Sequence, residues 1–134
     1  VCVIDLDPVM PGSMLYDFGD ALRIGGSTAA EDEVELDKVW FDERAFEAFA
    51  KGYLSEMREA LTEDELALLP LSVKLMTYEC GIRFLTDFLN GDTYFKIHRE
   101  HHNLDRARNQ FKLVADIAGK EGLLAKMVEA ALKG

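Results

Sequence analysis

The stretch that decides the fold is Leu71-Ser72-Val73-Lys74-Leu75-Met76-Thr77-Tyr78-Glu79-Cys80-Gly81-Ile82-Arg83-Phe84-Leu85-Thr86-Asp87-Phe88-Leu89. Its apolar residues fall on more than one side of a helix, which is typical of a helix that is buried on most of its circumference. Asn90-Gly91 follows, and these residue types tolerate the left-handed backbone conformation that ends many helices. The sequence therefore predicts a long buried helix here and a mainly α fold.

Helix-start signals precede this stretch. Thr62-Glu63-Asp64-Glu65 has the pattern of a capping box, in which a threonine and a glutamate satisfy each other's backbone N–H groups. Pro70 is predicted either to kink the helix that begins there or to restart it. Further upstream, Asp42 is predicted to cap a helix whose apolar stripe runs from residue 46 to residue 61.

The first predicted helix, residues 13–23, contains Asp17-Phe18-Gly19, the letters of the metal-binding triplet of protein kinases. In kinases the metal-binding aspartate follows directly on a strand, whereas Asp17 lies inside a helical pattern beyond a turn. We therefore predict a structural role for the triplet. Asp17 and Asp20 are expected to bond backbone groups or a basic side chain such as Arg23.

Downstream of the central helix, Asn103 is predicted to cap a helix over about residues 104–119. A separate amphipathic helix is predicted over about residues 122–133. Three histidines lie between residues 98 and 102. They lack a carboxylate or cysteine at settled ligand spacing, so a transition-metal site is not predicted there.

The composition limits the classes of partner. The 134 residues, 49% of them hydrophobic, suffice for the core of one domain. A net charge of −10 argues against nucleic acid as a partner, although a divalent cation would still allow a nucleotide to bind. The acidic run within residues 26–39 is predicted to be a solvated loop.

Cysteine usage and hydropathy indicate the compartment. The sequence spacing of Cys2 and Cys80 suggests neither a zinc site nor a disulfide framework, which favours a reducing, cytoplasmic setting. The chain shows no charged-then-apolar leader and no apolar run approaching about 18 residues. Neither secretion nor a membrane-spanning segment is predicted.

The N-terminal run Val1-Cys2-Val3-Ile4 is predicted to be a short β segment buried on both faces. Asp5 and Asp7 follow where such a strand would emerge, and carboxylates at a strand end can bind a cation that bridges nucleotide phosphates. The alternative is a pair of loop aspartates that cap a helix. A buried strand at a terminus leaves its backbone groups unpaired, so we expect this chain to be the C-terminal part of a larger protein.

Glu79, Arg83 and Asp87 are spaced four residues apart and so line one row of the central helix. One alternative is a ladder of ion pairs that faces water. The other is that the helix projects Arg83 into a cleft, where its planar guanidinium can bind ligand oxygens. The spacing alone favours the ladder.

Longer motifs resemble a known family. The run from Val3 to Arg23, Val-Ile-Asp-Leu-Asp-Pro-Val-Met-Pro-Gly-Ser-Met-Leu-Tyr-Asp-Phe-Gly-Asp-Ala-Leu-Arg, is similar to the segment after the catalytic loop in the aminoglycoside phosphotransferase and choline kinase-like superfamily. The resemblance is closest to the N-acetylhexosamine 1-kinases and extends to about residue 116. Its further motifs are Ser27–Glu33, Leu36–Val39, Leu68–Pro70, Glu79–Leu85, Gly91–Phe95 and His102–Leu104.

This resemblance implies that residues 1–134 are the helical C-terminal lobe of a protein kinase-like α+β fold. The activity it implies is transfer of the γ-phosphate of ATP to the anomeric hydroxyl of N-acetylglucosamine or N-acetylgalactosamine. Asp5 matches the family's magnesium-binding aspartate, with Asp7 beside it as support. Arg83 and Tyr94 match sugar-binding positions, which reverses the preference for an ion-pair ladder. ATP, Mg²⁺, the sugar and the protein's own N-terminal lobe are the implied partners.

The family's catalytic loop, His-x-Asp followed by Asn, precedes the strand and is absent from this chain, as is the lobe that covers ATP. The aspartate that acts as general base is therefore expected upstream of Val1. By this reading the 134-residue chain alone has no kinase activity.

Two other functions are considered. One is a related small-molecule kinase that acts on an aminoglycoside, choline or an amino alcohol, although choline needs an aromatic cage and an aminoglycoside several carboxylates. Arg83 with Tyr94 suits a neutral, oxygen-rich sugar better. The other is a non-catalytic helical interaction domain. The sequence argues against it, because no exposed apolar stripe is expected beyond what the core needs.

Overall fold

Helix-capping residues explain where the first three α-helices of this protein begin. The computed structural model describes residues 2, 6 and 9–133. In chain order the elements are α1 (Met14–Gly25), η1 (Leu36–Lys38), α2 (Glu43–Met57), η2 (Arg58–Ala60), α3 (Glu63–Leu89) and α4 (His102–Ala131). The prediction of a mainly α fold is confirmed. The predicted β segment, residues 1–4, falls mostly outside the described residues.

Side-chain caps are present at the starts of α1, α2 and α3. Ser13 accepts a hydrogen bond from a backbone N–H of the first turn of α1, and Asp42 accepts two from the first turn of α2. The Thr62 N–H donates to the Glu65 carboxylate at 2.8 Å, while Thr62 Oγ1 accepts the Glu65 N–H at 3.3 Å. These bonds satisfy N–H groups that have no partner inside the helix.

Pro70 does not restart a helix. α3 runs unbroken from Glu63 to Leu89, with Pro70 buried inside it. A proline at this position leaves the carbonyl oxygen of Leu66 without its usual donor. Of the two alternatives considered for Pro70, the restart is therefore wrong.

The prediction of two helices after residue 103 is also wrong, because α4 is continuous. Gly119 and Gly122 lie where the predicted break falls, and each costs about 1 kcal/mol relative to alanine in a helix. Both are exposed, while buried apolar residues on either side of them belong to one core. These are Leu113, Ile117, Leu124 and Val128. Burial of a shared face keeps the helix intact through the two glycines.

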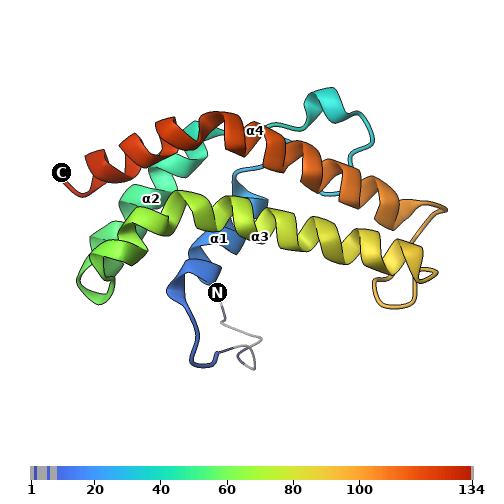
Figure 1. Ribbon diagram of the computed structural model, residues 1–134, viewed down its shortest axis with the longest axis horizontal. Coiled ribbons are helices and arrows are strands. Elements are labelled where there is room, and N and C mark those ends of the chain that lie inside the picture. The colour runs from blue at the N-terminus through green and yellow to red at the C-terminus, as the bar shows by residue number, and fades with distance from the viewer. Residues whose placement is uncertain (1, 3–5, 7–8, 134) are drawn as a thin grey trace.

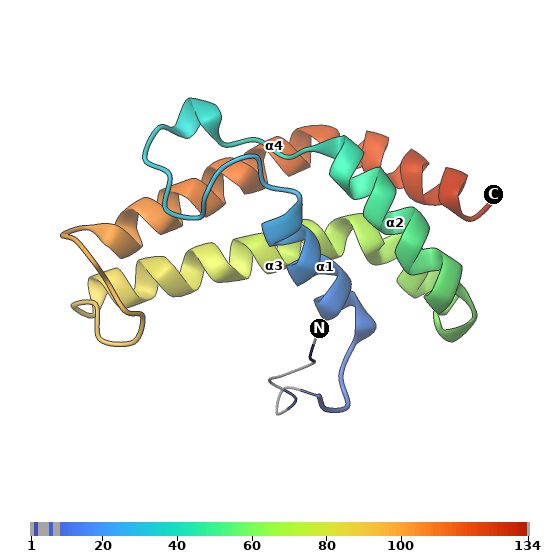
Figure 2. The ribbon, with the colours of Figure 1, turned by 180° about the vertical axis from the view of Figure 1, so that it is seen from behind.

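The helices form two layers. α3 and α4 lie antiparallel and side by side, and α1 and α2 pack on one face of this pair (Figures 1 and 2). The core lies between the layers. Its fully buried large side chains include Phe18, Leu22, Phe41, Phe46, Leu66, Leu69, Val73, Leu113, Ile117 and Leu124.

Phe18 and Gly19 of the triplet contribute to this packing, in line with the predicted structural role, while Asp17 is exposed. Phe18 is fully buried and meets Phe46 edge to face, with ring centroids 5.9 Å apart. A Cβ atom on Gly19 would lie 2.6 Å from the carbonyl oxygen of Ser72, so only glycine allows α1 to approach α3 this closely. Asp20 pairs with Arg23 at 2.8 Å, also as expected.

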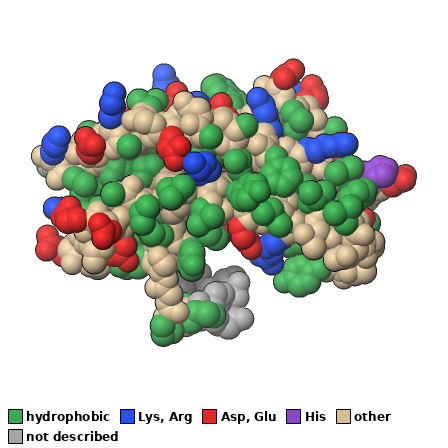
Figure 3. Space-filling view, in the orientation of Figure 1, with side chains coloured by type: hydrophobic (Ala, Val, Ile, Leu, Met, Phe, Trp, Pro, Cys, Tyr) green, Lys and Arg blue, Asp and Glu red, His purple; other side chains and the backbone are tan. Residues whose placement is uncertain are grey.

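The opposite face of α3 is exposed, which corrects two expectations. Five large apolar side chains there are between 39% and 51% exposed, and we call them the α3 apolar row. They are Leu68, Leu71, Leu75, Tyr78 and Ile82. Figure 3 shows hydrophobic side chains gathered along this side of the molecule. α3 is therefore not buried on most of its circumference, and the chain does expose an apolar stripe beyond its core.

Replacing glycine by alanine should have opposite effects on stability at Gly19 and at Gly52, because only Gly19 is closely packed. We expect Gly19→Ala to lower the free energy of unfolding by about 1–3 kcal/mol, because the new methyl group clashes with the backbone of α3. Gly52→Ala, on an open side of α2, should raise it by about 0.5–1 kcal/mol. Urea denaturation measures both, and equal stabilisation by the two substitutions would contradict the close packing of α1 on α3.

Candidate functional site

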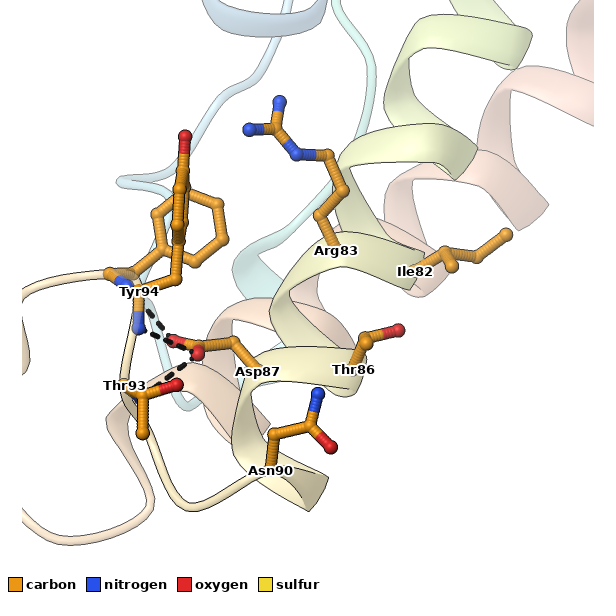
Figure 4. A pocket seen from close by; sticks show the side chains of 8 residues that line it. Ile82, Arg83, Thr86, Asp87, Asn90, Thr93 and Tyr94 are labelled. Carbon is orange, nitrogen blue, oxygen red and sulfur yellow. Dashed lines mark hydrogen bonds between the residues drawn. The ribbon is translucent and has the colours of Figure 1, made fainter.

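A pocket lies where the last turns of α3 meet the loop that follows them (Figure 4). Its volume is about 390 Å³, within the usual range for small-molecule sites. The residues that line it are Ile82, Arg83, Thr86, Asp87, Asn90, Thr93, Tyr94 and Phe95. Arg83 and Tyr94, the two residues matched to sugar-binding positions, are thus brought together in one pocket.

Aromatic rings hold the Arg83 guanidinium at the pocket wall. Its central carbon lies 5.8 Å from the ring centroid of Tyr94 and 5.4 Å from that of Phe95, within the range of cation–π attraction. The Arg83 side chain is still 49% exposed and Tyr94 is 74% exposed. Both groups are therefore accessible to a ligand.

The row Glu79, Arg83 and Asp87 is not a continuous ion-pair ladder. Arg83 Nε lies 3.7 Å from Glu79 Oε1, which is a loose contact between half-exposed groups. Asp87 instead directs its carboxylate at the loop after α3 (Figure 4). Of the two ion pairs that the spacing predicts, the structure therefore forms the one between Arg83 and Glu79 and not the one between Arg83 and Asp87.

Asp87 is buried, and its carboxylate accepts four hydrogen bonds. Oδ1 accepts the backbone N–H groups of Thr93 at 3.0 Å and Tyr94 at 2.8 Å. Oδ2 accepts the Phe95 N–H and the Asn103 side-chain amide, each at 2.9 Å. Burial alone would raise the pKa of Asp87, but the bonds from the loop backbone outweigh it and lower that pKa.

The same residue also ends the helix. The Asp92 N–H donates to the Asp87 carbonyl oxygen at 2.8 Å, and the Gly91 N–H donates to that of Phe88 at 3.1 Å. This is the Schellman pattern, which requires a left-handed residue after the cap. Gly91 supplies it, with φ of 87°. The predicted helix end at Asn90-Gly91 is confirmed.

Asn103 does not cap α4, which corrects the prediction for this residue. His101 occupies the cap position with φ of 60°, and Asn103 lies inside the first turn. Its side chain is fully buried and donates to Asp87 and to Asp92 Oδ1, the latter at 2.8 Å. Asn103 Oδ1 accepts from Arg106 at 3.1 Å. The asparagine joins α4 to both ends of the turn after α3.

The predicted magnesium site cannot be placed. Asp5 and Asp7 both lie outside the described residues. Within residues 2, 6 and 9–133, no group of three or more His, Cys, Asp or Glu side chains is arranged to hold a metal ion. His102 is buried and lies 3.0 Å from Asp32, while its other ring nitrogen accepts the His98 N–H at 3.2 Å.

The acidic loop is not simply a solvated face. Glu31 pairs with Arg23 at 2.6 Å, and the hydrogen bond from His102 lowers the pKa of Asp32. The carbonyl oxygen of Ala30 accepts the Asn109 amide at 2.9 Å. These contacts dock the loop onto α1 and α4, so part of its charge has a structural role.

Sequence reasoning missed Asn103 as part of the pocket's support and did not identify the contacts of Asp87. The helix-ending Asn90-Gly91 was a usable signal, because a helix that ends with a left-handed glycine turns the chain back toward its own last turn. A buried carboxylate in that last turn is then a suitable acceptor for the loop N–H groups.

Comparison with known families adds no assignment, since no protein-family model matches this sequence. Among the described residues, none of the helices combines the length and apolarity that a membrane span requires. The pocket geometry is therefore the main structural observation that bears on function.

The lowered pKa of Asp87 predicts how the pocket responds to acid. A carboxylate with a depressed folded-state pKa stabilises the fold above its unfolded value, about 3.9, and this stabilisation is lost as pH falls through the folded-state pKa. NMR should show the amide signals of Thr93, Tyr94 and Phe95 shifting together as pH falls, with a common midpoint below about 3.9. Asp87→Asn should abolish that titration. A midpoint above about 3.9 would contradict the assignment.

Proposed function

We propose that this chain is the helical C-terminal lobe of a sugar 1-kinase, which transfers the γ-phosphate of ATP to the anomeric hydroxyl of an N-acetylhexosamine. The observation that carries the proposal is the pocket shared by Arg83 and Tyr94. The two residues were matched to sugar-binding positions through separate motifs, one in α3 and one in the following loop. That both residues line one pocket is an observation independent of the sequence motifs, and it supports the resemblance.

The chemistry of the pocket favours a neutral, oxygen-rich ligand. Arg83 offers a planar set of donors to sugar oxygens, and the Tyr94 ring offers an apolar face. Thr86, Asn90 and Thr93 add hydroxyl and amide groups. A volume of about 390 Å³ accommodates a monosaccharide.

Charge argues against the related small-molecule kinases. A cationic aminoglycoside or choline would meet the Arg83 guanidinium in this pocket, and like charges repel. Among the described residues that line the pocket, only Asp87 carries a carboxylate, and its hydrogen-bonding capacity is used by the loop and Asn103. A cationic ligand would therefore find no free counter-charge among these lining residues.

Phosphoryl transfer depends mainly on positioning and charge neutralisation. In this proposal Arg83 and Tyr94 orient the sugar, while the general base and the ATP-covering lobe belong to the upstream part of the protein. Asp5, supported by Asp7, is the proposed ligand of Mg²⁺, which would neutralise phosphate charge when bound. The proposed setting is cytoplasmic.

The α3 apolar row favours a second candidate function, a helical interaction domain. Exposed apolar side chains in a continuous row are a common feature of interaction surfaces. This candidate needs no small-molecule ligand, so the two functions differ in whether the Arg83 pocket binds a sugar. The row is also compatible with a lobe that packs against the rest of a kinase.

The coding sequence upstream of Val1 is the first test. The proposal predicts a His-x-Asp-x-x-x-x-Asn loop roughly 15 to 20 residues before Asp5. The longer protein should then phosphorylate N-acetylglucosamine or N-acetylgalactosamine in preference to choline, ethanolamine or an aminoglycoside. The isolated 134-residue chain should not turn over ATP with either sugar.

Arg83→Ala tests the pocket itself. In the longer protein we expect it to raise the KM for the sugar about 10- to 100-fold, because hydrogen bonds from a charged group are lost, and to leave the KM for ATP unchanged. Arg44→Ala, at an exposed position on α2, is the matched control. Equal sugar KM values for the two variants would overturn the role of Arg83, and turnover by the isolated chain would overturn the division into lobes.

A further inference from the structure

We infer that Asp87 is a positioning residue whose carboxylate, together with Asn103, holds the loop after α3 in the conformation that forms the sugar pocket. The inference rests on the proposed function for the identity of the ligand. It assigns to Asp87 no contact with the reacting atoms. Its supporting side chains, Asp87 and Asn103, are distinct from those of Arg83 and Tyr94, which contact the ligand in the proposal.

The geometry begins with three consecutive N–H groups that converge on one carboxylate. Thr93, Tyr94 and Phe95 all donate to Asp87, at distances from 2.8 to 3.0 Å (Figure 4). A loop backbone fixed at three successive residues has little freedom left at the middle one. The backbone of Tyr94, and hence the place from which its ring enters the pocket, is set by Asp87.

Asn103 connects this loop to α4. Its amide nitrogen bridges Asp87 Oδ2 and Asp92 Oδ1, at 2.9 and 2.8 Å. The side chain is fully buried, so each of these bonds replaces one that water would otherwise supply. Removing either Asn103 or Asp87 would leave a buried polar group without its partner, which is costly.

The loop in turn positions Arg83. Phe95 is fixed through its N–H. Its ring centroid lies 4.7 Å from that of Phe84 and 5.4 Å from the Arg83 guanidinium carbon. Arg106, which donates to Asn103, covers the Phe84 ring at 5.3 Å. Both ligand-binding side chains therefore depend on the same support.

Asp87 is unsuited to act as the general base although it lines the pocket. A base must have a free lone pair within reach of the proton that it removes. Each oxygen of Asp87 already accepts two hydrogen bonds, which accounts for the usual capacity of a carboxylate. Its role is confined to holding the loop.

Amide hydrogen exchange on the 134-residue chain tests the support directly. Asp87→Asn should remove the exchange protection of the Thr93, Tyr94 and Phe95 amides and leave that of Leu113 in the core unchanged. Asp64→Asn, at an exposed position in the first turn of α3, is the matched control and should change neither. If Asp87→Asn does not fold, Asn103→Ala should lower the exchange protection of the same three amides, because it removes the bond that holds the Asp87 carboxylate from α4.

Kinetics of the longer protein test the positioning role. Asp87→Asn should raise the KM for the N-acetylhexosamine about 10- to 100-fold, the effect expected of a small displacement of binding groups, with the KM for ATP unchanged. Unaltered amide protection in the variant, or lost protection with an unaltered sugar KM, would overturn the inference. If the wild-type protein phosphorylates no sugar, the proposed function fails and the sugar role of Asp87 fails with it. The exchange result then still decides whether Asp87 holds the loop.

Discussion

The close antiparallel packing of α3 on α4 is the constraint on which the rest of this structure depends. A Cβ atom at Gly81 of α3 would lie 2.9 Å from the ring of Phe111 on α4, so the helices meet there with no room for a side chain. Burial of Phe84, Leu113 and Ile117 along the two helices supplies the apolar contribution to this contact. α1 and α2 complete the core from one side.

This pairing creates the site as a consequence of topology. Two long antiparallel helices bring the end of α3 and the start of α4 to the same end of the molecule, and the chain between them must turn there. The turn is stabilised by groups from both helices, Asp87 from one and Asn103 from the other. Arg83 and Tyr94 are thereby placed on either side of one pocket, which explains how the end of a helical bundle can present a ligand site.

The exposed face of α3 gives the molecule a second feature of interest. The same helix carries the pocket at its C-terminal end and the α3 apolar row along one side, and Ile82 belongs to both. A partner or lobe that covers the row would therefore contact the edge of the pocket.

Local signals in the sequence determined the helix starts at Ser13, Asp42 and Thr62, and the helix end at Gly91, because capping depends on residues only a few positions apart. The mainly α class followed from the same signals together with apolar periodicity. Motifs also singled out Arg83 and Tyr94 as a pair.

Tertiary structure alone decided the rest. The continuity of α4 through its glycines reflects burial against the core, and the exposed side of α3 reflects which neighbours are present; neither property is local. The role of Asn103 was decided in the same way, because Asp87 and Asp92 are separated from it in sequence and meet it only after the helices pair. Spacing could place Asp87 on a row of α3, but only the folded loop determines that its carboxylate binds backbone N–H groups and not an arginine.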